Sequence, residues 1–102
     1  MIMVTYRVDA DALADIDGHR PAHLAHARSY ADMVRFAVTG KCPVTGEVQR
    51  AIFILDIDDE DVVRQFVADE PYLASGIFTS PEITRADVRM GALAPLPASA
   101  NR

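Results

Sequence analysis

The apolar residues of this chain follow two spacings, one typical of strands and the other of helices. Four segments are rich in strand-forming residues, and in the first of them apolar side chains fall at every second position. The third segment is apolar on both faces in its middle, which is typical of a central strand. Strands are therefore expected at residues 1–8, 35–39, 48–57 and 78–90.

Between these strands, apolar residues recur at the i, i+3, i+4 and i+7 spacing of an amphipathic helix. The first helix is expected to begin near His19–Pro21, after a turn at Asp17-Gly18, and to run to about Val34. A second helix is expected over residues 60–69 and ends before Pro71. The buried stripe of the first helix is expected to contain Ala22, His23, Leu24, Ala27, Tyr30, Ala31 and Val34.

The order β-α-β-β-α-β predicts an α+β fold of the ferredoxin-like type, a four-stranded antiparallel sheet with two helices on one face. We expect a single domain over residues 1–90 and an Ala/Pro-rich tail over 91–102. The other face of the sheet stays open. Met3, Phe53 and Leu55 indicate that this face is apolar and needs a cover. A second copy of the chain is the simplest cover, so we expect a homodimer.

Composition narrows the classes of function. The chain of 102 residues is 50% hydrophobic and 25% charged, as in an ordinary globular domain. Its formal net charge of −5 argues against general binding to nucleic acid or to an anionic membrane, because both need a basic face. One cysteine excludes an internal disulfide and a Cys-based zinc site. No segment has the pattern of a signal peptide or a membrane span, so we expect a cytoplasmic protein with a small-molecule ligand.

Three histidines in the first predicted helix are candidates for chemistry. His19, His23 and His26 are spaced i, i+4 and i+3, so a metal site has to be considered. No acid lies between them as in the zinc-protease helix, and we expect neither a metal nor another cofactor. His19 and His26 are interpreted as solvated residues. His23 lies on the apolar stripe and is either a core histidine with one hydrogen bond or a general base.

Two acids at the end of the second predicted helix form the other candidate cluster. Asp69 and Glu70 stand where the helix dipole disfavours negative charge. Either this helix end is exposed and screened, or one carboxylate has a partner. In the functional interpretation, that carboxylate holds His23 in one tautomer and raises its basicity. Pro71 and Tyr72 then form the rigid turn that holds the carboxylate.

The same residues carry a resemblance to a known family. Residues 20–25, Arg-Pro-Ala-His-Leu-Ala, resemble the segment that opens the first helix of YciI-like (YCII-related) proteins. Residues 70–78, from Glu-Pro-Tyr to Gly-Ile-Phe, resemble the acid-Pro-aromatic segment after their second helix. The resemblance implies a dimeric α+β barrel with a His–Asp pair in a cleft. It also implies chemistry on small cyclic or aromatic compounds, as in the dehydrochlorinases among its members. Fold cousins include muconolactone isomerases and cofactor-free monooxygenases.

This chain departs from the family pattern at the acid. The family has Asp directly before the proline, whereas Glu70 occupies that position here and Asp69 precedes it. Glu70, Asp69 or neither therefore faces His23. We hypothesise a cofactor-independent lyase or isomerase in which His23 abstracts a proton and one acid orients it. Arg20, Tyr72 or an arginine on a strand then binds the substrate and stabilises the resulting oxyanion. The alternatives are a non-catalytic small-molecule-binding or regulatory dimer and a cofactor-free monooxygenase.

Overall fold

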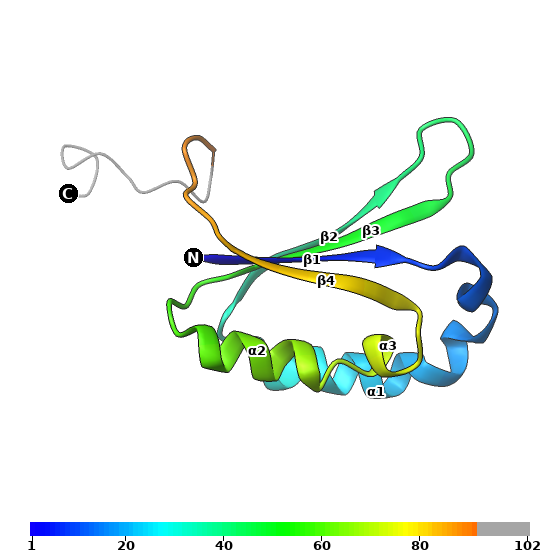
Figure 1. Ribbon diagram of the computed structural model, residues 1–102, viewed down its shortest axis with the longest axis horizontal. Coiled ribbons are helices and arrows are strands. Elements are labelled where there is room, and N and C mark those ends of the chain that lie inside the picture. Colours follow the sequence, from blue (N-terminus) through cyan, green and yellow to red (C-terminus); the bar gives the residue numbers. More distant parts are fainter. Residues whose placement is uncertain (92–102) are drawn as a thin grey trace.

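The computed structural model describes residues 1–91, which form one sheet with helices on a single face (Figure 1). The strands are β1 (Ile2–Val8), β2 (Val34–Lys41), β3 (Val48–Leu55) and β4 (Phe78–Arg85). The helices are η1 (Ala10–Asp15, a 3₁₀ helix), α1 (Ile16–Ser29), α2 (Glu60–Ala68) and α3 (Pro71–Ala74). All strand pairs are antiparallel and the strand order is β2-β3-β1-β4. The predicted ferredoxin-like α+β fold is confirmed.

The core lies between the helices and the two central strands, β1 and β3. Every second side chain of these strands points into it, as the two-residue period of a strand requires, and α2 adds its apolar face. The core residues are Ile2, Val4, Tyr6, Ala51, Phe53, Leu55, Val63, Phe66, Val67, Tyr72, Ile77 and Phe78. By contrast, His26 is the one buried residue of α1, so α1 packs less deeply than α2.

The apolar residues of the uncovered sheet face differ from those expected. The prediction that Phe53 and Leu55 lie on this face is wrong, because both side chains are buried in the core under the helices. Strand alternation places Ile52 and Ile54 on the opposite side, where Met3 pairs with Ile54 across β1 and β3. Two residues of β2 pair with the same isoleucines. We call the set the open face; it consists of Met3, Phe36, Val38, Ile52 and Ile54.

The bounds of α1 also differ from the prediction. The helix begins at Ile16 and not near His19–Pro21. Asp17-Gly18, predicted as a turn, lies inside the helix, because η1 leads directly into α1 and half-buried Ile16 packs against the core. The helix ends at Ser29, and Val34 begins β2, where it pairs with β3.

The buried stripe of α1 is rotated from the predicted one. Ala22, Leu24 and Ala31 are exposed. His26, predicted as solvated, is buried, and its ring lies 5.0 Å from that of Phe66 on α2. Periodicity gives the spacing within a stripe, but the neighbouring elements decide which stripe meets the core.

The last strand is shorter than predicted. The ladder between β1 and β4 reaches its final pair at Ile2 and Arg85, and the Ala86 N–H then donates to the Met1 carbonyl at 2.9 Å. The prediction of strand over 86–90 is therefore wrong. The predicted tail over 91–102 lies, from residue 92 onward, outside the described residues. In the described part of the chain, no helix has the length and apolar character needed to cross a bilayer.

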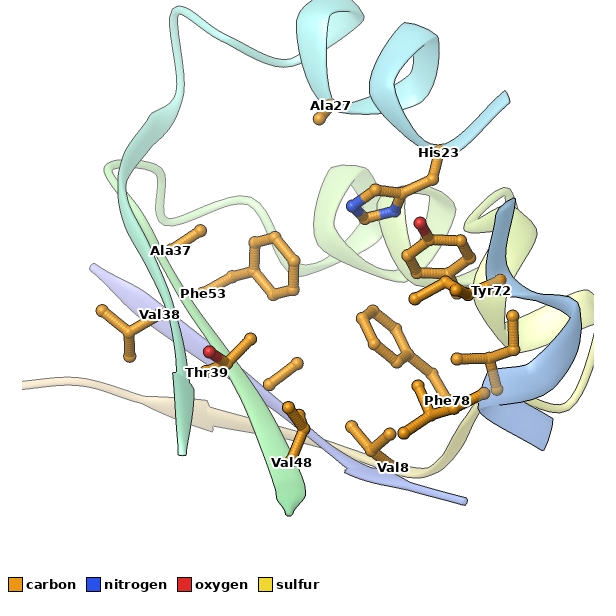
Figure 2. A pocket seen from close by; sticks show the side chains of 14 residues that line it. Val8, His23, Ala27, Ala37, Val38, Thr39, Val48, Phe53, Tyr72 and Phe78 are labelled. Carbon is orange, nitrogen blue, oxygen red and sulfur yellow. The ribbon is translucent and has the colours of Figure 1, made fainter. Parts of the chain in front are cut away.

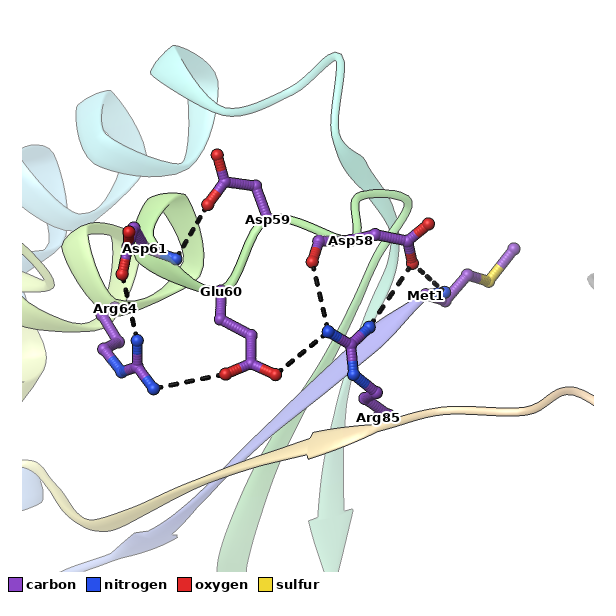
Figure 3. A network of polar contacts seen from close by, with 7 residues as sticks. All are labelled: Met1, Asp58, Asp59, Glu60, Asp61, Arg64 and Arg85. Atoms are coloured by element: carbon purple, nitrogen blue, oxygen red, sulfur yellow. Dashed lines mark hydrogen bonds and ion pairs between the residues drawn. The ribbon is translucent and has the colours of Figure 1, made fainter.

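Ion pairs join the start of α2 to the ends of β1 and β4 (Figure 3). Arg85 on β4 lies 3.1 Å from Glu60 and 3.8 Å from Asp58. Glu60 also contacts Arg64 at 3.2 Å, and Asp58 contacts the Met1 amino group at 3.4 Å. Most of these groups are exposed, so each pair adds little stability. They connect the start of α2 to the neighbouring ends of β1 and β4.

Candidate functional site

A cavity of about 390 Å³ lies between α1 and the β2–β3 side of the sheet (Figure 2). Its walls include three alanines, Ala27 on α1, Ala37 on β2 and Ala51 on β3. Protein interiors are otherwise close-packed. Small side chains on facing elements, together with the shallow packing of α1, therefore explain the empty space.

The lining of the cavity is almost entirely apolar. Among residues 1–91, only His23, Thr39 and Tyr72 bring polar side chains to it, and no Lys, Arg, Asp or Glu of this range lines it. The rings of Phe53, Tyr72 and Phe78 surround the His23 imidazole (Figure 2). The volume is near the lower end for ligand pockets, so the cavity suits a small, uncharged ring.

His23 is held firmly at the wall of this cavity. Its ring stacks on Tyr72, with centroids 3.9 Å apart and 7° between the planes, and meets the edge of Phe78 at 5.9 Å. Its Nδ1 lies 2.6 Å from Oε1 of Glu70. No hydrogen bond to Nε2 comes from any residue in the range 1–91. The second ring nitrogen is therefore available to a ligand.

The contacts of Glu70 decide which nitrogen of His23 carries the hydrogen. Oε1 accepts from the backbone N–H of Tyr72 at 3.1 Å, so this oxygen is an acceptor and Nδ1 donates to it. The Glu70 residue is only 1% exposed. A neutral His23 then has its lone pair on Nε2, which is the arrangement of an oriented general base.

The helix that places Glu70, α3, was not predicted. Glu70 is its N-cap, and Pro71 occupies the first turn. An acid followed by proline is a recognisable helix start, because the acid accepts free N–H groups and proline lacks one. The expected conflict with the dipole of α2 is therefore absent at Glu70, since negative charge is favoured at an N-terminus.

Asp69 lies apart from this pair. It is the C-cap of α2, it is exposed, and its Oδ2 accepts from Nε2 of Gln65 at 2.8 Å. Of the two acids left open by the sequence, Glu70 is the one that contacts His23.

The two predicted substrate-binding residues have different positions. Tyr72 lines the cavity. Arg20 is exposed on the outer side of α1, where it pairs with Asp17 at 2.9 Å and borders a separate depression with Leu24 and Arg28. The structure therefore does not bring Arg20 to the cavity.

Sequence reasoning missed a polar cluster behind the His23–Glu70 pair. Nε2 of His26 lies 3.7 Å from Oε2 of Glu70, and both atoms are buried without a hydrogen bond. The buried hydroxyl of Tyr6 also has no partner in the described chain. Burial raises the pKa of Tyr6, and the charge of Glu70 adds to this effect. The i, i+3 spacing of His23 and His26 was the available signal. Within residues 1–91, no group of three His, Cys or acidic side chains has the geometry to hold a metal ion.

Comparisons with known proteins identify a family and a shared fold. A profile of the YCII-related domain matches residues 1–87. One similar solved structure is 5-chloro-2-hydroxyhydroquinone dehydrochlorinase (TftG) from Burkholderia phenoliruptrix, in complex with 2,5-dihydroxybenzoquinone. The two chains are 22% identical, the match covers 93% of this chain and 100% of that chain, and the TM-score is 0.69. The likeness to TftG shows a shared fold. Among curated proteins, no sequence matches this chain.

Proposed function

Since this chain belongs to the family of YCII-related domains, we propose that it is a cofactor-independent lyase or isomerase acting on a small, uncharged cyclic or aromatic metabolite. The observation that carries the proposal is the 2.6 Å contact between His23 and buried Glu70 at the wall of an apolar cavity. An oriented base beside an apolar cavity is suited to proton abstraction.

In the proposed reaction, Nε2 of His23 takes a proton from the substrate. The imidazolium forms next to the Glu70 carboxylate, which stabilises the positive charge through the bond from Nδ1. In an isomerisation, Nε2 returns the proton to another atom of the same molecule. In an elimination, the electron pair of the broken bond to hydrogen forms a double bond while an anion leaves, and His23 then releases its proton to water.

The lining of the cavity supports the proposed substrate class. A carboxylate or phosphate would lose its hydration there without meeting a lysine or arginine of the described chain, and burial of an unpaired charge is unfavourable. An uncharged ring instead packs on Phe53 and Phe78, and the hydroxyl of Thr39 on β2 is available for a polar substituent. The name and bound ligand of TftG describe hydroxylated rings for that protein, which makes such rings the first compounds to test here.

We also propose that the protein is a homodimer joined through the open face. Phe36 and Val38 are 36% and 45% exposed on this face, and Ile52 extends the same apolar surface to the middle of the sheet. A continuous apolar surface on a sheet is a common contact site between subunits. The cavity lies on the helix side of the sheet, and Val38 on β2 borders both the cavity and the open face.

The proposed function is tested by exchange and elimination assays on a panel of compounds. Cyclic diketones, hydroxyquinones and chlorinated hydroquinones are incubated with the protein in D₂O, while NMR follows deuterium uptake and an electrode follows released chloride. At least one compound is expected to react. His23→Gln should lower its rate by about 10²–10⁴-fold, the usual contribution of a general base.

His19→Gln is the matched control, because His19 lies on the same helix and makes no contact with Glu70. A reaction that survives His23→Gln contradicts the proposal. Tight binding of a ring without any turnover would support the binding-module alternative, and turnover coupled to oxygen consumption would support the monooxygenase.

A further inference from the structure

The polar atoms behind the His23–Glu70 pair have no role in the proposed function so far. In the described part of the chain, three buried side-chain atoms lack a hydrogen bond: Oη of Tyr6, Nε2 of His26 and Oε2 of Glu70. Such atoms are rare in folded proteins, because burial removes their bonds to water. Two of them, on His26 and Glu70, face each other at 3.7 Å.

One of these two atoms is an acceptor and the other can be a donor. Oε2 of Glu70 is an acceptor without a donor, and Nε2 of His26 is a donor when it carries the ring hydrogen. The 3.7 Å separation is within ion-pair range but too long for a hydrogen bond. Hydrogen bonds in active sites are often long without a ligand and shorten when one binds.

We propose that His26 is a positioning residue whose Nε2–H donates to Oε2 of Glu70. The carboxylate is then held between two histidines, with Oε1 turned to His23 and Oε2 turned to His26. With both oxygens engaged, the carboxylate is prevented from rotating away from Nδ1 of His23. The inference deepens the proposed function and rests on it only for the effect on turnover.

The aromatic surroundings of His26 explain how its ring is oriented. They also suggest an alternative role, in which the ring only fills space in the core. The ring lies 5.0 Å from Phe66 and 5.1 Å from Tyr30, between centroids. If His26 only fills space, Phe is a good replacement because it keeps these aromatic contacts. If His26 is a donor, Gln is better, because its side-chain amide can place an N–H near the position of Nε2.

Tyr6 is the other buried donor without a hydrogen bond in the described chain. Its phenol is buried without a partner, and it lies close enough for the charge of Glu70 to act on it. Tyr6→Phe removes only the hydroxyl and keeps the stacking on Phe78 at 4.7 Å. It therefore serves as the matched variant for the donor assignment.

The test is NMR of the substrate-free protein with ¹⁵N-labelled histidine at neutral pH. In the wild type, Nε2 of His26 is expected to have the shift of a protonated ring nitrogen. The Nδ1 proton of His23 is expected far downfield, as in a short bond to a carboxylate. This signal should move upfield and broaden by exchange with water in His26→Phe. It should keep its wild-type position in His26→Gln and in Tyr6→Phe.

Several results overturn the proposal. If Nε2 of His26 is unprotonated in the wild type, the proposal fails, and this result does not depend on the folding of any variant. An unchanged His23 signal in His26→Phe shows that no donor is needed, and an equal loss in His26→Gln shows that an N–H at this position is not what holds the carboxylate. Loss in Tyr6→Phe alone assigns the donor to Tyr6.

The spectra separate this inference from the proposed function. If no compound reacts but the His26 donor is observed, the enzyme proposal fails and the positioning role stands. If turnover depends on His23 while His26→Phe leaves both the spectrum and the pH profile of turnover unchanged, the positioning role fails and the enzyme proposal stands.

Discussion

Among single residues, the side chain of Glu70 combines structural and chemical contacts. One oxygen caps α3 by accepting from the N–H of Tyr72 and also accepts from His23. The other oxygen faces His26 at 3.7 Å. Because Glu70 is almost fully buried, water is unable to replace these contacts when the carboxylate is removed.

Glu70→Ala is therefore expected to lower the free energy of unfolding by about 2–4 kcal/mol, from the loss of a helix cap and of a buried hydrogen bond. Asp69→Ala is the control, because Asp69 is exposed and bonds only to Gln65. Its effect should stay within about 0.5 kcal/mol. Urea unfolding followed by circular dichroism measures both, and equal losses would contradict the assignment of Glu70 as the buried partner.

The raised pKa of Tyr6 predicts how the free energy of unfolding changes with pH in the alkaline range. Burial, and then the charge of Glu70, raise the pKa of Tyr6 above its usual value near 10. Above about pH 10, the unfolded chain releases this proton while the folded protein retains it, so the free energy of unfolding falls as pH rises. Below that pH the contribution is fully present. In Tyr6→Phe the fall above about pH 10 should be less steep, as urea unfolding at a series of pH values would show. Parallel pH profiles would contradict it.

At the scale of elements, local patterns were sufficient for β1, β3 and α2. Alternation and apolar runs define the two strands, and α2 has an acidic first turn and a clear buried face. The short elements η1 and α3 were missed, although the acid-proline pair at Glu70 marks the start of α3. The start of α1 was misplaced because Asp17-Gly18 is a turn pattern that the preceding 3₁₀ helix overrides.

The candidate site was predictable to a similar extent. His23 could be selected because it falls on an apolar stripe near a cluster of acids. The choice between Asp69 and Glu70 depends on the turn between α2 and α3, where neighbouring residues point in different directions. The burial of His26 depends on Phe66, which lies on another helix. Periodicity within one helix contains no information about such a neighbour.

The N-cap of α2 gives a prediction at this scale. The Asp59 side chain accepts from the N–H of Asp61 at 2.9 Å (Figure 3). Asp59→Ala is expected to lower the free energy of unfolding by about 1 kcal/mol, because this N–H loses its acceptor. Asp59→Asn keeps an acceptor oxygen and should restore most of the loss. Thermal unfolding would measure the difference, and equal melting temperatures for the two variants would argue against a capping role.

For the whole molecule, the sheet has one covered face and one apolar face without a cover in the described chain (Figure 1). Helices and cavity are on the first face, so the proposed ligand site and the proposed subunit contact lie largely on opposite sides of the same sheet. Val38 on the open face also lines the cavity, whereas Phe36 does not, so a change at Phe36 tests assembly without altering the lining of the site.

Phe36→Asp is expected to convert the proposed homodimer into a monomer, because each partner would bury a charge against apolar residues. Leu24→Asp is the matched control: Leu24 is 42% exposed, close to the 36% of Phe36, but it lies on the outer side of α1. Light scattering after size exclusion should give twice the 11.1 kDa chain mass for the wild type and the control. A wild-type monomer, or a Phe36→Asp dimer, would rule out this interface.

The double use of Glu70 has a consequence for how such a chain can evolve. Selection for folding alone is enough to retain an acid that caps α3, even in a descendant that has lost all turnover. His23, half-buried at the edge of an empty space, is under weaker structural constraint. Loss of the proposed activity is therefore expected to begin at the histidine and to leave the carboxylate in place. An inactive relative would be recognised by a retained acid without its histidine.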